Sequence, residues 1–98
     1  MAPTYDFLAP IERDWSRLTS AQKAQFNAAR HQFVEDLRAG HGFRPSLRVK
    51  GVQGAPGVFE LTWAPDGRAT FSYGPEQFAG ETHIIWRRIG THCIFNRP

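Results

Sequence analysis

Residues 58–73, VFELTWAPDGRATFSY, decide the fold of this chain because they contain two alternating segments joined by a tight turn. Apolar and polar side chains alternate in each segment, which predicts two β-strands that each bury one face. In the turn, Pro65 presets its own φ angle, and Gly67 is expected to supply a positive φ. The stretch therefore predicts an antiparallel hairpin. Its buried face is expected to carry Phe59, Leu61, Trp63, Ala69, Phe71 and Tyr73.

Three further segments outside the hairpin are predicted strands. Residues 83–89 are apolar on both faces, which is typical of a central strand. Residues 47–50 alternate apolar and basic side chains, so Arg48 and Lys50 are expected on one side of a strand. Residues 4–8 are short and rich in aromatic side chains, and they predict a brief first strand.

Between the first strand and the hairpin, apolar residues recur at the spacing of an α-helix. This spacing is found in residues 11–18 and again in residues 26–37. Thr19 and Gln22 between them predict a capping box, and Gly40 is placed to end the second helix in a left-handed conformation. The pattern predicts two helices joined by a very short turn.

Together these elements predict an α+β fold of order β-α-α-β-β-β, in which an N-terminal helical hairpin packs on a small antiparallel sheet. The length of 98 residues allows one domain, residues 1–98. The helices are expected to cover one face of the sheet. The other face is then polar and basic, and function is expected there.

The distribution of charge points to the same half of the chain. Lys plus Arg number 12 and Asp plus Glu number 9, a net charge of 12 − 9 = +3. Residues 1–43 hold five basic and five acidic side chains, whereas residues 44–98 hold seven basic and four acidic ones, 7 − 4 = +3. If a polyanion binds this protein, it is expected to bind the second half.

Several classes of protein are excluded by the sequence. The single cysteine, Cys93, cannot form an internal disulfide, and no cysteine or histidine spacing fits a zinc site. The sequence has neither a signal peptide nor an apolar run long enough to span a membrane. We therefore expect a soluble cytoplasmic protein that uses no metal and no cofactor.

Three residues on or beside the uncovered face could carry catalysis. Arg68 opens a strand directly after the turn, and a guanidinium binds phosphate through paired hydrogen bonds, although it could also be an ordinary solvated arginine. His92 follows the last strand and can accept or donate a proton near neutral pH. Glu60 could be a general base or only an ion-pair partner of Arg68 or Arg48. Cys93 is expected to point away from His92, which disfavours a thiol nucleophile.

Three other cations could hold neighbouring phosphates: Arg48, Lys50 and Arg88. Arg87 and Arg88 are adjacent, so at most one of them is expected on the face that holds Arg68. By parity that residue is Arg88, provided that no bulge intervenes. These residue types suffice for metal-free RNA cleavage, which needs a base for the 2′-hydroxyl, a cation for the phosphate and a proton for the leaving oxygen.

The ordered set of segments resembles the RelE/ParE superfamily of small bacterial toxins. The resemblance covers residues 4–95, from the helical hairpin containing WSRL (15–18), through LRVKG (47–51), GVFELTW (57–63) and GRATF (67–71), to IIWRRIGTH (84–92). The ending IGTHCIF (89–95) is most similar to the branch of HigB- and YoeB-like toxins, whose catalytic histidine follows the last strand.

The resemblance implies a ribosome-dependent endoribonuclease (an mRNA interferase) that cuts mRNA in the ribosomal A site and is neutralised by a cognate antitoxin. By position, Arg68 matches the arginine that stabilises the phosphate and His92 the catalytic position. Arg48 and Lys50 match the basic segment that contacts RNA. The general base is His92 or Glu60. ParE-like members share the fold yet poison DNA gyrase, so a non-catalytic gyrase inhibitor and a degenerate nucleic-acid-binding member are the alternatives.

The chain also departs from the family pattern at three places. Glu60 and Thr62 stand where RelE-type members carry lysines. The carboxylate that YoeB-like members carry before the basic segment falls near Pro45, and the C-terminal tyrosine of several members falls near Phe95.

Overall fold

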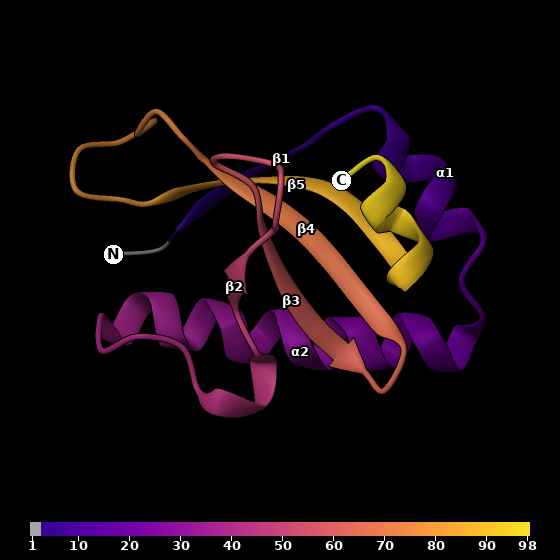
Figure 1. The fold of residues 1–98 in the computed structure, drawn as a ribbon. Helices are drawn as coiled ribbons and strands as arrows, with labels where there is room; N and C mark the ends of the chain where they lie inside the picture. The colour runs from indigo at the N-terminus through magenta and orange to yellow at the C-terminus, as the bar shows by residue number, and fades with distance from the viewer. Residues whose placement is uncertain (1–2) are drawn as a thin grey trace.

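The computed structural model describes residues 3–98, which form a five-stranded sheet with two helices on one face (Figure 1). The spatial order of the strands is β1-β5-β4-β3-β2. The strands are β1 (Thr4–Phe7), β2 (Lys50–Gly51), β3 (Phe59–Ala64), β4 (Gly67–Gly74) and β5 (His83–Thr91), and the helices are α1 (Pro10–Ser16) and α2 (Ser20–Ala39). Two short 3-10 turns complete the fold: η1 (Pro45–Leu47) and η2 (His92–Asn96).

The predicted α+β fold is confirmed, with one change in the sheet. The pairs β2–β3, β3–β4 and β4–β5 are antiparallel, as expected, but β1 runs parallel to β5. The sheet is therefore mixed. The first strand, β1, lies at an edge next to the last strand, β5, and the helices and the other strands come between them in sequence.

Local signals explain the helices. Pro10 occupies the first turn of α1, where its missing N–H costs nothing. At the start of α2 the hydroxyl of Thr19 accepts a hydrogen bond from the N–H of Gln22 at 3.1 Å, and the amide oxygen of Gln22 accepts one from the N–H of Thr19 at 2.8 Å. This is the predicted capping box. Gly40 ends α2 with φ 72°, also as predicted.

Aromatic side chains form the core between the helices and the sheet. Phe33 of α2 is fully buried and meets the ring of Phe71 edge to face at 4.9 Å between centroids. Phe26 contacts Trp86 in the same manner at 5.7 Å. Tyr73 is predicted on this buried face, but 46% of it is exposed because it lies near the outer end of β4.

Gly67 has a different role from the one predicted. It does not adopt a positive φ and belongs to β4. A Cβ atom at this position would lie 2.5 Å from the ring of Trp63. The turn therefore needs glycine because the indole packs closely against the backbone, and not because of a left-handed conformation.

The predicted strand over residues 47–50 is wrong in its extent. Leu47 ends η1, and Arg48 follows it with φ 47°. Only Lys50 and Gly51 pair with β3. Pro45 favours the 3-10 turn, so the alternation in the sequence does not place Arg48 and Lys50 on one side of a strand.

A β-bulge lies in the middle of β5. Thr70 of β4 pairs with Arg88, but the next residue, Phe71, pairs with Trp86, so that Arg87 is an extra residue. Trp86 and Ile89 both enter the core. Arg87 and Arg88 therefore both lie on the other face of the sheet, whereas the strict alternation predicted only Arg88 there.

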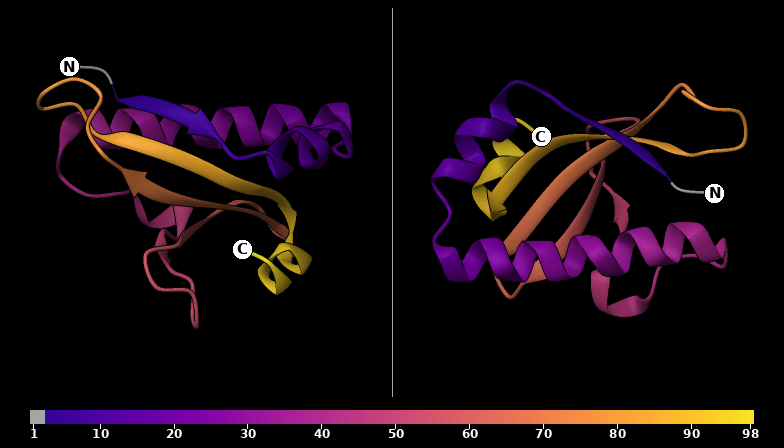
Figure 2. Two further views of the ribbon diagram at one scale, coloured as in Figure 1. Left: turned by 90° about the horizontal axis from the view of Figure 1, so that it is seen from above. Right: turned by 180° about the vertical axis from the view of Figure 1, so that it is seen from behind.

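The C-terminal segment covers part of that second face. Figure 2 shows η2 on the opposite side of the sheet from α2. Thr70 is fully buried, and its hydroxyl donates to the main-chain oxygen of Pro98 at 2.9 Å. Nε of Arg87 donates to the same oxygen at 3.1 Å, and Nη1 of Arg88 donates to the main-chain oxygen of Arg97 at 3.1 Å.

Candidate active site

A histidine and an aspartate meet at the end of the sheet that carries the β3–β4 turn. Nδ1 of His92, the first residue of η2, lies 2.7 Å from Oδ1 of Asp66 in the turn. Both side chains are mostly exposed, at 69% and 62%. The hydrogen bond to His92 holds the pKa of Asp66 below its usual value, and the charge of Arg68 contributes in the same direction.

This contact prepares the imidazole for proton transfer. A carboxylate that accepts from Nδ1 favours the tautomer in which Nε2 carries the lone pair. Nε2 of His92 forms no hydrogen bond with any of residues 3–98. His92 can therefore receive a proton from a bound molecule at Nε2 while Asp66 stabilises the cation that results.

Arg68 forms hydrogen bonds with the main chain of the same turn. Its Nη1 donates to the main-chain oxygens of Ala64, Pro65 and Gly67 at 3.2, 3.2 and 2.9 Å. No carboxylate in residues 3–98 forms an ion pair with it. The turn thus fixes one end of the guanidinium and leaves its charge available to an anion.

The structure brings Arg68 and His92 to one turn, but it does not bring Glu60 there. Glu60 lies opposite Thr70 in the sheet, whereas Arg68 lies opposite Thr62. The Glu60 side chain is only 12% exposed, and one of its oxygens lies 3.9 Å from Nζ of Lys50. Glu60 is therefore an ion-pair partner, but it pairs with Lys50 and not with Arg68 or Arg48.

The three other predicted phosphate-binding cations, Arg48, Lys50 and Arg88, have different surroundings. Lys50 pairs with Glu60, and Arg48 lines a groove that also includes Arg68. Arg88 forms a paired contact with the buried carboxylate of Asp14 in α1, at 2.7 Å from Nε and 3.0 Å from Nη2. This contact raises the pKa of Arg88, and the N–H of Ile89 donates to the same carboxylate at 3.1 Å.

Asp66 is the site residue that sequence reasoning misses. Its place between Pro65 and Gly67 marks it only as a turn residue, and its partner His92 lies 26 positions away. One feature of the sequence could have pointed to Asp66. It lies two residues before Arg68, in the turn of the hairpin, and this turn lies at the end of the sheet.

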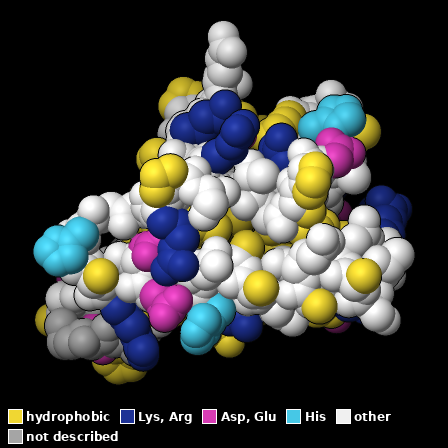
Figure 3. Space-filling view, turned by 90° about the horizontal axis from the view of Figure 1, so that it is seen from below, with side chains coloured by type: hydrophobic (Ala, Val, Ile, Leu, Met, Phe, Trp, Pro, Cys, Tyr) yellow, Lys and Arg dark blue, Asp and Glu magenta, His cyan; other side chains and the backbone are white. Residues whose placement is uncertain are grey.

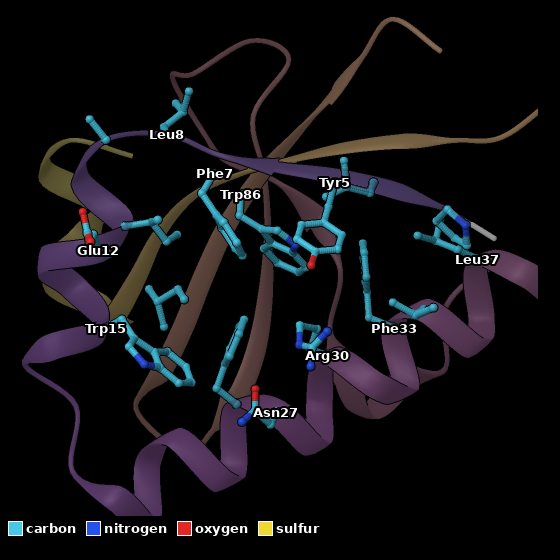
Figure 4. A pocket seen from close by; sticks show the side chains of 17 residues that line it. Tyr5, Phe7, Leu8, Glu12, Trp15, Asn27, Arg30, Phe33, Leu37 and Trp86 are labelled. Carbon is cyan, nitrogen blue, oxygen red and sulfur yellow. The ribbon is translucent and has the colours of Figure 1, made fainter. Parts of the chain in front are cut away.

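A separate apolar groove of about 570 Å³ lies on the helical side of the molecule. Figure 4 shows Tyr5 and Phe7 of β1 and Trp15 of α1 around the same space, with Phe33 of α2 beside them. Tyr5 and Phe7 are 59% and 53% exposed, although β1 belongs to the sheet. The outer edge of β1 has no strand partner among residues 3–98, so this groove runs along an open sheet edge.

The described residues hold no group of three or more histidine, cysteine or acidic side chains that could bind a metal ion. Neither helix within residues 3–98 is long and apolar enough to cross a membrane.

Comparison with known proteins identifies the fold. No protein-family model and no curated protein sequence matches the chain. Among solved structures, a chain of the E. coli DinJ–YafQ toxin–antitoxin complex matches with a TM-score of 0.65 and 13% identity, over 95% of this chain and 96% of that one. The YoeB/ParE toxin from Agrobacterium tumefaciens matches with a TM-score of 0.65 and 11% identity, over 91% and 98%.

A third neighbour is the RelB–RelE antitoxin–toxin complex from Methanococcus jannaschii, with a TM-score of 0.59 and 15% identity over 94% of this chain and 98% of the other. The fold is therefore that of the RelE/ParE-like toxins of type II toxin–antitoxin systems, and the resemblance stated from the sequence is confirmed at the level of the fold. The neighbours include YafQ and YoeB toxins.

Proposed function

We propose that this protein is the toxin of a type II toxin–antitoxin system and an endoribonuclease that cleaves mRNA in the A site of the ribosome. The observation that carries this proposal is the turn at residues 64–67, which holds Arg68 through its carbonyl oxygens and His92 through Asp66. A fixed cation and a proton acceptor at one place are two of the three groups that RNA cleavage requires, and the third is a proton for the leaving oxygen. The RelE-like fold supports the same class of activity.

The cleavage proceeds without a metal. Nε2 of His92 takes the proton of the 2′-hydroxyl, and the 2′-oxygen attacks the adjacent phosphorus. Arg68 stabilises the negative charge that grows on the phosphate oxygens. The bond from phosphorus to the 5′-oxygen breaks, and the leaving oxygen takes a proton from water. The products are a 2′,3′-cyclic phosphate and a 5′-hydroxyl.

The other predicted residues receive roles that follow from their contacts. Arg48 and Lys50 hold neighbouring phosphates, since both side chains are largely exposed. Glu60, the other candidate for the base, orients Lys50. Arg88 is the weakest of the RNA-binding candidates, because Asp14 and the oxygen of Arg97 already occupy three of its five N–H donors.

The partners are the ribosome with its mRNA, in the cytoplasm, and a cognate antitoxin. The structural neighbours include toxin–antitoxin complexes. We assign the antitoxin to the apolar groove beside β1, because Tyr5 and Phe7 are exposed there and the sheet edge is open. An antitoxin segment on this surface would bury aromatic rings that otherwise face water.

The proposal is tested by mRNA cleavage in a translating extract. The wild-type protein should give new mRNA 5′ ends within A-site codons, whereas Arg68→Ala and His92→Ala should give none while circular dichroism shows both variants folded. Cleavage at the wild-type rate by both variants would contradict the site. A supercoiling assay with DNA gyrase runs in parallel, and loss of supercoiling with intact mRNA would favour a gyrase poison instead.

A further inference from the structure

A second groove, of about 650 Å³, lies directly beside Arg68 on the open side of β3. The strand β2 pairs only with Phe59 and Glu60, so the outer edge of β3 beyond Glu60 has no strand partner among residues 3–98. Helix α2 forms one wall, η1 and Arg48 form another, and the β3–β4 hairpin forms the third. Figure 3 shows this side of the molecule hollowed, with apolar side chains at the floor and Lys and Arg side chains nearby.

Several polar groups of this groove lack partners within the described part of the chain. Four side chains that line it form no hydrogen bond with any of residues 3–98: Gln25, Gln32, Ser46 and Thr62. The indole Nε1–H of Trp63 is also without a partner, and this residue is only 8% exposed. Buried polar groups in folded proteins are nearly always paired, so this buried N–H beside the groove lacks an acceptor, which a bound molecule could supply if the lining shifts.

The backbone at Arg48 places a cation at this groove. Arg48 is the one non-glycine residue among residues 3–98 with a positive φ. This left-handed conformation ends η1, where the N–H of Arg48 donates to the main-chain oxygen of Pro45 at 3.1 Å. Here it holds an exposed guanidinium at the rim of the groove that Arg68 also lines.

The chemistry of the lining fits a nucleobase better than an apolar peptide. A primary amide offers a donor and an acceptor side by side, which matches the pairing edge of a base, and single-stranded RNA is recognised through such edges and through stacking. Arg48 and Arg68 supply positive charge on the flanks, where the backbone phosphates of a bound nucleotide would lie. The groove beside β1, in contrast, is lined mainly by apolar side chains.

We infer that this groove binds one base of single-stranded RNA, next to the phosphate that Arg68 holds, and that Gln25 and Gln32 read the edge of that base. The inference rests on the proposed function for the identity of the phosphate site. It adds a specificity site: the base in the groove selects which codons are cut.

The direct test is a titration followed by the indole N–H resonance of Trp63, assigned through its contacts with the protons of Gly67. The ¹⁵N-labelled full chain is titrated with the four nucleoside 5′-monophosphates, with ribose 5-phosphate and with inorganic phosphate. At least one nucleotide should shift the resonance at concentrations where ribose 5-phosphate does not. The Gln25→Ala/Gln32→Ala variant should bind that nucleotide about tenfold more weakly, as expected for the loss of one or two hydrogen bonds.

The matched control is Gln53→Ala, which changes an exposed glutamine in the loop before β3 and should leave the affinity unchanged. An equal response to ribose 5-phosphate, or an unchanged affinity in the double variant, would overturn the inference. A resonance that responds to an antitoxin peptide and to no nucleotide would also overturn it.

The ribosomal assay separates this inference from the proposed function. The double variant should still cleave mRNA but with an altered preference among codons. Unaltered cleavage and preference would overturn the base site and leave the proposed function intact. Failure of the wild type to cleave any mRNA would overturn the proposed function, and the nucleotide titration would then decide the groove alone.

Discussion

The imidazole of His92 and the carboxylate of Asp66 lie 2.7 Å apart although the residues are 26 positions apart in sequence. The register of the sheet brings them together, because Gly67 at the start of β4 pairs with Thr91 at the end of β5. The residue before Gly67 and the residue after Thr91 are therefore neighbours. This register makes a turn residue and a histidine at the end of β5 a hydrogen-bonded pair.

Replacing Asp66 by asparagine should abolish most of the activity without unfolding the protein. The amide keeps the size of the side chain but not its charge, so the imidazolium that forms in the reaction loses its stabilisation. We expect the rate of mRNA cleavage to fall by about 10²–10⁴-fold in Asp66→Asn. Single-turnover cleavage on programmed ribosomes measures this. A rate within about twofold of the wild type would show that Asp66 has no part in catalysis.

The same pair should make stability depend on pH in the acid range. The hydrogen bond from His92 lowers the pKa of Asp66 below its ordinary value of 3.8. The folded state therefore gains stability above the unfolded pKa, and this gain is lost as the pH falls through the lowered value. Urea unfolding at several pH values should show the difference between wild type and Asp66→Asn shrinking in acid. A difference that stays constant would contradict the assignment.

Arg88→Met should destabilise the fold strongly. Asp14 is 5% exposed and would keep a buried charge without its partner, which costs about 3–5 kcal/mol. The matched control is the double variant Asp14→Leu/Arg88→Met, which removes both charges and should recover a large part of the loss. Denaturant unfolding of the three proteins checks this, and equal stability of the single and double variants would contradict it.

Gly67→Ala should be harmful although glycine there has no unusual backbone angle. The added methyl group would meet the Trp63 ring at 2.5 Å, and overpacking of this kind costs about 1–3 kcal/mol. Gly51→Ala is the control, since nothing lies within 4 Å of its Cβ position. Thermal unfolding should show a clear loss for the first variant and little change for the second. Equal melting temperatures would mean that the indole can move aside without cost.

Phe7→Ser should weaken neutralisation by the antitoxin and leave cleavage intact. Phe7 is 53% exposed at the apolar groove, and a central aromatic contact is worth about 2 kcal/mol, or about thirtyfold in Kd. Titration calorimetry with the antitoxin and a growth assay with both proteins measure the effect. An unchanged Kd would place the antitoxin elsewhere.

The parts of the fold that the sequence predicts correctly are those set by neighbouring residues. The hairpin of β3 and β4 follows from its alternation and its turn, and the start of α2 follows from Thr19 and Gln22. The parallel pairing of β1 with β5 could not be predicted in the same way, because it joins Thr4 to His83, 79 positions later.

In the candidate site, too, only the features set by local sequence could be predicted. Arg68 and His92 are candidates because of their residue types and their places at strand ends. The partnership of His92 with Asp66 depends on the register of two strands, and that of Arg88 with Asp14 depends on how α1 packs against β5. Neither partnership leaves a periodic signal in the sequence.

The pairing of β1 with β5 also fixes the order in which the sheet can be completed during synthesis. β1 is made first, yet its partner spans His83–Thr91, and His92 follows only after that. A nascent chain that still lacks β5 has neither a closed sheet nor a proton acceptor beside Asp66. For a protein that we propose to attack ribosomes, the proposed site therefore cannot assemble before residues 83–92 have been made.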